Sequence, residues 1–160
     1  MSNNRLFPKV RGMRTIFMEI LIAVLMLTSS LAWGSSADHV GIVKSMAGEV
    51  EIARGDLILN AEPNFKLFEG DIVQTGPNGK AGLILEDDTV ISMGYNSKIA
   101  IKSFMFQPEE KKLSFIARIF QGTVSFLSGR ITQLAPDQVR IETPHATVGT
   151  RGTHVLIRVD

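Results

Sequence analysis

The fold is decided in the closing stretch of the chain, where residues 141–159 read IETPHATVGTRGTHVLIRV. On each side of a central pivot, β-prone residues alternate with polar ones, and this period of two places one set of side chains on one face of a strand. Pro144 cannot donate a ladder hydrogen bond, so it ends the first strand. Gly149 and Gly152 can adopt positive φ where the chain must bend sharply. We therefore predict a strand, a short second strand at residues 146–148, a glycine-framed corner and a closing strand.

The first 37 residues have a different character. Residues 5–14 are basic, residues 16–31 are almost wholly apolar, and small residues follow at 34–37. This is the order of a secretory signal, and its uninterrupted apolar part is short for a spanning helix, which needs roughly 20 apolar residues. We predict that residues 1–37 are a signal peptide, with an uncleaved membrane anchor as the alternative.

Export follows from either interpretation of this leader. Residues 38–160 would form one domain located in the periplasm or secreted, or anchored in the inner membrane and facing the periplasm if the leader stays attached. In that case the leader would be its only contact with a membrane. Cysteine is absent from the chain, which excludes a disulfide scaffold, a thiolate metal site and a cysteine nucleophile.

The charge is divided unevenly between the two parts. Residues 1–37 carry four Lys/Arg and one Glu, whereas residues 38–160 carry the remaining 13 Lys/Arg against 15 Asp/Glu. The basic character of the whole chain therefore comes from the leader. A nearly neutral body argues against a nucleic-acid partner, which would need a basic footprint.

The body itself consists of short β-prone runs separated by turn residues. Gly76-Pro77-Asn78-Gly79 is the clearest turn, since proline pre-sets φ and Asn-Gly accepts positive φ. Strands of about five residues at a spacing of roughly ten, without a long amphipathic helix, predict an all-β domain. We expect short antiparallel strands forming a rolled sandwich or a solenoid-like β roll.

Some segments carry more specific expectations. Residues 113–120 and 123–127 are interpreted as two strands on either side of Gly122, and residues 131–137 as a loop around Pro136. Phe104 and Phe106 are expected to continue the apolar face of a strand at residues 98–102 and so to pack in the core.

A search for catalytic or metal-binding residues finds no convincing set. The three histidines, at positions 39, 145 and 154, lack the spacing of metal ligands. The acidic pairs Asp87-Asp88 and Glu109-Glu110 are expected in solvated turns rather than as acid/base pairs. No nucleophile elbow or phosphate-binding loop is present. We predict no enzyme activity, no cofactor and no metal.

Taken together, three stretches of the body resemble the FecR-domain family, named for the ferric-citrate regulator of bacterial envelopes. They are residues 43–54, with GEVEI at 48–52, residues 67–89, and residues 143–153. The region at 86–89 departs mildly from the family pattern, which usually has Asp-Gly there. The residues that we assign to the structural motif are Gly70, Asp71, Thr75, Gly76, Gly79, Thr143, Pro144, Gly149, Arg151, Gly152 and Thr153.

This resemblance implies an all-β extracytoplasmic module without known catalysis. In the best-known members it relays a signal from an outer-membrane transporter to a cytoplasmic sigma factor. An anchored form of this chain would leave about fifteen residues in the cytoplasm, too few for a sigma-binding domain. It also ends at the closing strand, so we do not expect the relay to carry over intact.

We predict a non-catalytic, exported interaction module whose partner is another protein of the cell envelope, with a role in signalling as one form of this function. The alternative is a module that binds a small ligand or an envelope polysaccharide, with Tyr95, Phe104 and Phe106 as contacts. Arg151 either grips a carboxylate on a partner or ties its own corner to a neighbouring strand, and the tight corner favours the second role.

Overall fold

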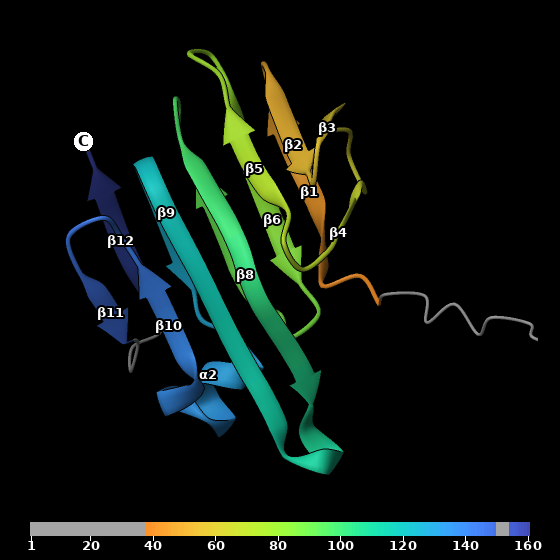
Figure 1. Ribbon diagram of the computed structural model, residues 1–160, viewed down its shortest axis with the longest axis vertical. Helices are drawn as coiled ribbons and strands as arrows, with labels where there is room; N and C mark the ends of the chain where they lie inside the picture. The colour runs from red at the N-terminus through yellow and green to blue at the C-terminus, as the bar shows by residue number, and fades with distance from the viewer. Residues whose placement is uncertain (1–37, 150–153) are drawn as a thin grey trace, which may run out of the picture. The chain divides into compact units, whose positions relative to one another are not determined.

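The computed structural model describes residues 38–149 and 154–160, so the predicted leader and residues 150–153 of the closing corner lie outside it. The described residues are mostly β-structure (Figure 1). The elements are β1 (Gly41–Ala47), β2 (Val50–Arg54), β3 (Leu57–Asn60), β4 (Lys66–Leu67), β5 (Ile72–Thr75), β6 (Lys80–Leu85), β7 (Val90–Met93), β8 (Lys98–Gln107), η1 (Pro108–Glu110), β9 (Lys112–Leu127), α2 (Arg130–Leu134), η2 (Pro136–Gln138), β10 (Val139–Glu142), β11 (Thr147–Gly149) and β12 (His154–Val159).

All the strands belong to one curled sheet, which confirms the predicted all-β class. Its main path runs β3-β2-β5-β8-β9-β7-β6-β1-β4, with β10 and β12 added to β9, and β11 added to β10. The pairing is antiparallel except between β10 and β9, which are parallel. The curl brings the two halves of the sheet face to face, and their inward side chains form the apolar core.

The sheet can curl because β9 takes part in both halves. We predicted two strands here, but residues 112–127 form one strand that pairs with β8 along its first part and with β7 and β12 along its second. Gly122 marks the bend and has a φ of 90°. A Cβ at this position would collide with the Cα and Oγ of Ser97, so only glycine fits.

The partner strand β8 contains a second irregularity. Ile101 pairs with Ala117 and Ser103 with Ile116, which leaves one extra residue, Lys102, in a β-bulge. Before the bulge, the residues of β8 that belong to the core cluster are Ile99 and Ile101, whereas Phe104 and Phe106 pack against the core from even positions. The bulge is therefore what allows the two phenylalanines to continue the inward face, as predicted.

One predicted loop is wrong, because residues 131–137 are not irregular. They contain the helix α2 and the 3-10 turn η2, and Ile131 is fully buried between them and the sheet. Five residues are too few for apolar periodicity to indicate a helix. Burial of Ile131 supplies the stability that so short a helix lacks in isolation. Among the described residues, no helix has the length and apolar character needed to cross a membrane.

Candidate functional site

The predicted motif residues Gly70 and Asp71 form a turn that is tied to the neighbouring hairpin. The buried carboxylate of Asp71 accepts two hydrogen bonds from Arg54, both at 2.8 Å, and one from the backbone N–H of Phe68 at 2.9 Å. These bonds to Asp71 raise the pKa of the Arg54 guanidinium above its ordinary value. The Phe68 ring lies 4.4 Å from the same guanidinium, so the cation is held on two sides.

Thr75, Gly76 and Gly79 join three turns at the opposite end of the domain. The Thr75 hydroxyl donates to the Gly94 carbonyl at 2.7 Å and accepts from the Ser97 N–H at 2.8 Å. A Cβ at Gly79 would collide with the carbonyl oxygen of Glu49, so the turn can approach β2 this closely only with glycine. These residues position backbone rather than presenting chemistry.

The other motif residues belong to the closing stretch. Thr143 bridges the turn between β10 and β11, since its N–H and its hydroxyl both donate to the Ala146 carbonyl and its hydroxyl accepts from the Ala146 N–H. Pro144 is exposed in that turn, and Gly149 pairs with Arg140 at the end of β11. Arg151, Gly152 and Thr153 lie outside the described residues.

The acidic pair Asp87-Asp88 requires a correction, since only Asp88 is exposed. Asp87 is fully buried and accepts hydrogen bonds from the N–H and hydroxyl of Thr89 and from the N–H of Ile131. The carboxylate therefore holds the start of α2 against the β6–β7 turn. Buried carboxylates need such donors, and one of these, the N–H of Ile131, comes from 44 residues away in the sequence.

The three aromatic residues that we considered as contacts do not gather at one place. Tyr95 is 52% exposed in the turn before β8, and the Lys80 ammonium lies 4.7 Å from its ring. Phe104 and Phe106 lie near the other end of β8, roughly 20 Å away at the rise of an extended strand. Only the two phenylalanines therefore belong to the site described next.

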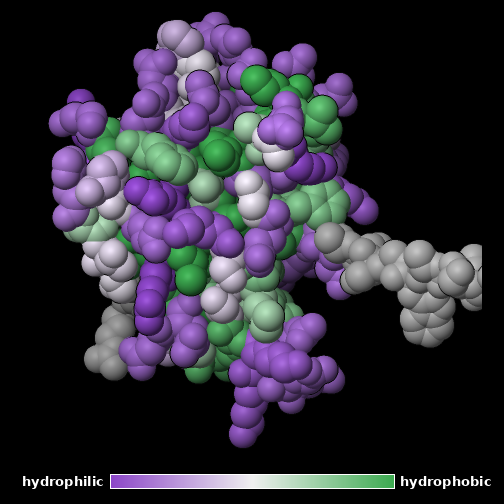
Figure 2. Space-filling model, in the orientation of Figure 1, coloured by the Kyte–Doolittle hydropathy of each residue, from purple (hydrophilic) through white to green (hydrophobic). Residues whose placement is uncertain are grey.

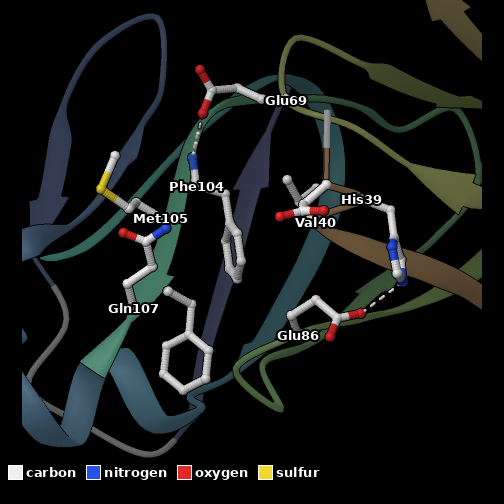
Figure 3. Close-up of a pocket in the computed structure, with 9 residues that line it drawn as sticks. His39, Val40, Glu69, Glu86, Phe104, Met105 and Gln107 are labelled. Atoms are coloured by element: carbon white, nitrogen blue, oxygen red, sulfur yellow. Dashed lines mark hydrogen bonds and ion pairs between the residues drawn. The ribbon is translucent and has the colours of Figure 1, made fainter. Parts of the chain in front are cut away.

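Phe104 and Phe106 line an open groove of about 450 Å³ (Figure 3). It is referred to below simply as the groove. Its walls come from four separate segments: residues 38–40 before β1, the β4–β5 turn, the β6–β7 turn and the end of β8. The groove lies where the two halves of the sheet part. Figure 2 shows that the face seen in Figure 1 is largely hydrophilic, with hydrophobic patches between the polar side chains.

Three carboxylates share the lining of the groove with the phenylalanine rings. Asp38, Glu69 and Glu86 line the groove, and no Lys or Arg is among the described residues of its lining. His39 Nε2 lies 3.0 Å from Glu86 Oε1, while Asp38 has no ion-pair partner among the described residues. Since opposite charges attract and like charges repel, the groove favours a cationic occupant.

One wall of the groove is a strand edge without a partner strand. Ile101 still bonds to the β4–β5 turn through Asp71 and Gly70, but after the bulge no described strand pairs with β8 on this side. Instead, the N–H of Phe104 donates to Glu69 Oε2 at 3.0 Å. A side-chain carboxylate thus occupies the place of a strand carbonyl. We call the outward backbone groups of Phe104 and Phe106 the β8 edge.

A second open edge lies on β12. The N–H of Gly94 donates to the Thr123 carbonyl, so the backbone groups of Thr123 point toward β7. Along β9 from this residue, the backbone groups of every second residue point toward β7, and those of the residues between them point toward β12. It follows from the register that the backbone groups of His154, Leu156 and Arg158 point away from β9. No described residue bonds to them. We call these groups the β12 edge.

Catalytic constellations do not stand out in the described part of the chain. None of the described residues lining the groove has a hydroxyl or a thiol, so the His39–Glu86 pair has no nucleophile beside it. Within residues 38–149 and 154–160, no group of three His, Cys, Asp or Glu side chains could hold a metal ion.

Comparison with protein families gives a match over the second part of the chain. The model of a family described as FecR protein matches residues 71–160, which is more than half of the chain. The match includes β5 to β12, and it begins after Asp38, His39 and Glu69, so part of the groove wall precedes it. No curated protein matches the chain, and no solved structure does.

Proposed function

Because this chain belongs to the FecR protein family, we propose that it is a non-catalytic binding module of the bacterial cell envelope that captures another envelope protein. The family itself suggests a role related to the envelope or to signalling. The leader supports export, since its basic, apolar and small-residue regions follow the order of a secretory signal. The domain would then act in the periplasm or outside the cell, free or held by an uncleaved leader.

The groove is the observation that carries this proposal. Its volume of about 450 Å³ lies within the usual range for binding pockets, and two aromatic rings line it. The strand edge in its wall offers unpaired backbone groups, which protein partners commonly use by adding a strand. A site with these two properties suits a segment of polypeptide.

Binding of a small ligand or an envelope polysaccharide is the second candidate. Phe104 and Phe106 support it, since aromatic rings in a groove can pack against an apolar or sugar surface. Tyr95 no longer contributes, because it lies near the other end of β8. The three carboxylates of the groove would disfavour acidic glycans.

Site-specific photo-crosslinking in cells tests the proposal. A photoreactive amino acid would replace Met105, which is 45% exposed and borders the groove, and in a control strain Tyr95, which is 52% exposed and lies outside it. We expect position 105 to give a discrete protein adduct that position 95 does not. Equal labelling at both positions, no protein adduct, or an adduct with glycan alone would contradict the proposal.

The site of action needs its own measurement. The N-terminal mass of the protein recovered from soluble and membrane fractions of the envelope shows whether the leader is removed. A start near Asp38 in the soluble fraction would mean a free exported module, and an intact Met1 in the membrane fraction an anchored one. Recovery of the whole protein from the cytoplasm would contradict export.

A further inference from the structure

We infer that the groove binds an extended polypeptide segment that carries a lysine or arginine two residues from an apolar residue, and that this segment adds to the β8 edge as a strand. The inference rests on the proposed function and names the chemistry of the partner at the same site. Three features carry it, namely the unpaired backbone, the charge of the lining and the position of the aromatic rings.

The backbone of β8 is prepared for another strand. The Lys102 bulge keeps alternate backbone groups directed at the groove, so those of Phe104 and Phe106 follow those of Ile101 on the same side. Glu69 satisfies the N–H of Phe104, while the Phe106 N–H and the two carbonyls have no partner among the described residues. An incoming strand can bond to these groups, and Glu69 can turn from the N–H to a cation.

The charge of the groove selects a basic side chain. Asp38, Glu69 and Glu86 belong to its lining, and none of the other described lining residues is a Lys or Arg. The guanidinium of Arg130 lies 4.9 Å from the Phe106 centroid and already uses that ring. A lysine or arginine entering between the sheet halves would meet carboxylates and the Phe104 ring, and both attract a cation.

Strand geometry sets the spacing of the two side chains. Residues i and i+2 of an added strand point to the same face, here the space between the sheet halves, while the residues beside them point to solvent. The inward pair would contact Phe104 and Phe106 with its apolar member and the carboxylates with its basic member. A free amine would gain the charge attraction but none of the backbone hydrogen bonds, so we favour polypeptide over a small cation.

Fluorescence anisotropy with a defined peptide tests this inference on the full-length protein purified from the envelope. The probe is labelled Thr-Val-Thr-Lys-Thr-amide, whose Val and Lys occupy positions i and i+2. We expect saturable binding, weakened about tenfold or more when Glu replaces the Lys of the peptide, because like charges then meet. Equal binding of the Lys and Glu peptides would overturn the charge selection.

Protein variants locate the charge. Replacing Asp38 and Glu86 by Asn and Gln should weaken binding of the Lys peptide about fivefold or more and flatten its salt dependence. The matched control, D56N/E109Q, removes two exposed carboxylates outside the groove and should bind as the unaltered protein does. Equal loss in both variants would mean that overall charge, not the groove, attracts the peptide.

The backbone requires a separate arm. The backbone N–H groups of a strand point alternately to its two sides, so the peptide can pair with β8 through either of two sets. A peptide methylated on the backbone nitrogens of Val and Lys keeps its charge but cannot pair through that set. A second peptide, methylated on the flanking Thr nitrogens, cannot pair through the other set. At least one should lose binding. Full binding by both peptides, or equal competition by n-butylamine, would overturn strand addition.

Failure of this inference is distinguishable from failure of the proposed function. If position 105 crosslinks a protein in cells but the Lys peptide does not bind, the partner chemistry is wrong and the function stands. If neither a cellular adduct nor peptide binding is found, both fall.

Discussion

The two open edges of the sheet offer the same backbone groups in different surroundings. The β8 edge lies in the wall of the groove, beside inward-facing phenylalanines, and carboxylates surround it. On the β12 edge, His154 and Arg158 flank Leu156, which is 66% exposed. A basic side chain beside an exposed edge, such as Arg158 here, is a known protection against unwanted pairing. The comparison teaches that the neighbouring side chains, not the unpaired backbone, determine which edge suits a partner.

The two edges also depend on different contacts. Glu69 holds the β8 edge from a turn that Asp71 and Arg54 fix in place. The β12 edge depends on pairing with the second part of β9, beyond the bend at Gly122. A substitution in the Asp71–Arg54 turn should therefore destabilise the β8 edge alone, and one that weakens the pairing of β12 with β9 should destabilise the β12 edge alone. A substitution at Gly122 should destabilise both edges.

The largest effect is expected at the bend. Gly122→Val would place a β-branched residue at a φ of 90° and drive its Cβ into Ser97, so we expect the free energy of unfolding to fall by about 3 to 5 kcal/mol. Urea titration followed by circular dichroism measures this. Gly55→Val is a control, since it shares a positive φ but nothing lies within 4 Å of its Cβ, and it should cost clearly less. Equal losses of unfolding free energy in the two variants would contradict our reading that the collision with Ser97 destabilises Gly122→Val.

A proline pair tests the direction of the β12 backbone. Ile157→Pro removes an N–H that faces β9 and leaves an acceptor unpaired, whereas Leu156→Pro removes one that points away from β9. We expect Ile157→Pro to cost about 2 to 3 kcal/mol more in unfolding free energy. Alanine variants at both positions, measured by the same titration, account for the side chains. A reversed order would mean that the edge is assigned to the wrong residues.

The support of the β8 edge is the next target. Asp71→Ala removes the partner of Arg54, whose side chain is 34% exposed, so solvent reduces the penalty and we expect a loss of about 2 kcal/mol. Amide hydrogen exchange should speed up at Phe104 more than at Val155, which bonds to β9. The double variant R54M/D71L should recover part of the stability, because no charge is left without its partner. Equal acceleration at both amides would mean that the turn does not act on β8 alone.

The smallest effect is expected from Glu69 itself. Glu69→Ala removes the acceptor of the Phe104 N–H at an exposed position, so the unfolding free energy should change by no more than about 0.5 kcal/mol. The exchange rate of the Phe104 amide should nevertheless rise, and Glu69→Gln, which keeps an acceptor oxygen, should restore it in part. An unchanged rate in Glu69→Ala would show that the carboxylate does not substitute for a strand carbonyl.

Much of the fold could be predicted from local sequence. Alternation along residues 154–159 predicted a strand with one set of side chains on one face, and β12 confirms the strand, with Val155, Ile157 and Val159 as its less exposed residues. The paired phenylalanines of β8 were also expected on the core side. Periodicity works here because a strand side chain faces inward or outward according to its position alone.

The groove could not be predicted in the same way. Its lining comes from residues 38–40, 69, 86 and 104–107, which no spacing pattern connects. Of the candidate contacts, Phe104 and Phe106 belong to this lining, whereas Tyr95 lies before the start of β8 and is separated from them by most of that strand. The acids of the rim, Glu69 and Glu86, looked like ordinary turn residues.

By itself, the sequence determined the strands, the turns, the all-β class and the family, because backbone preferences and alternation act between near neighbours. Tertiary structure alone decided that Asp87 is buried, that β9 bends at Gly122 to join both halves of the sheet, and that β8 and β12 keep open edges. The reason is physical: burial and edge pairing depend on which distant segments meet, and residues far apart in the chain supply those contacts.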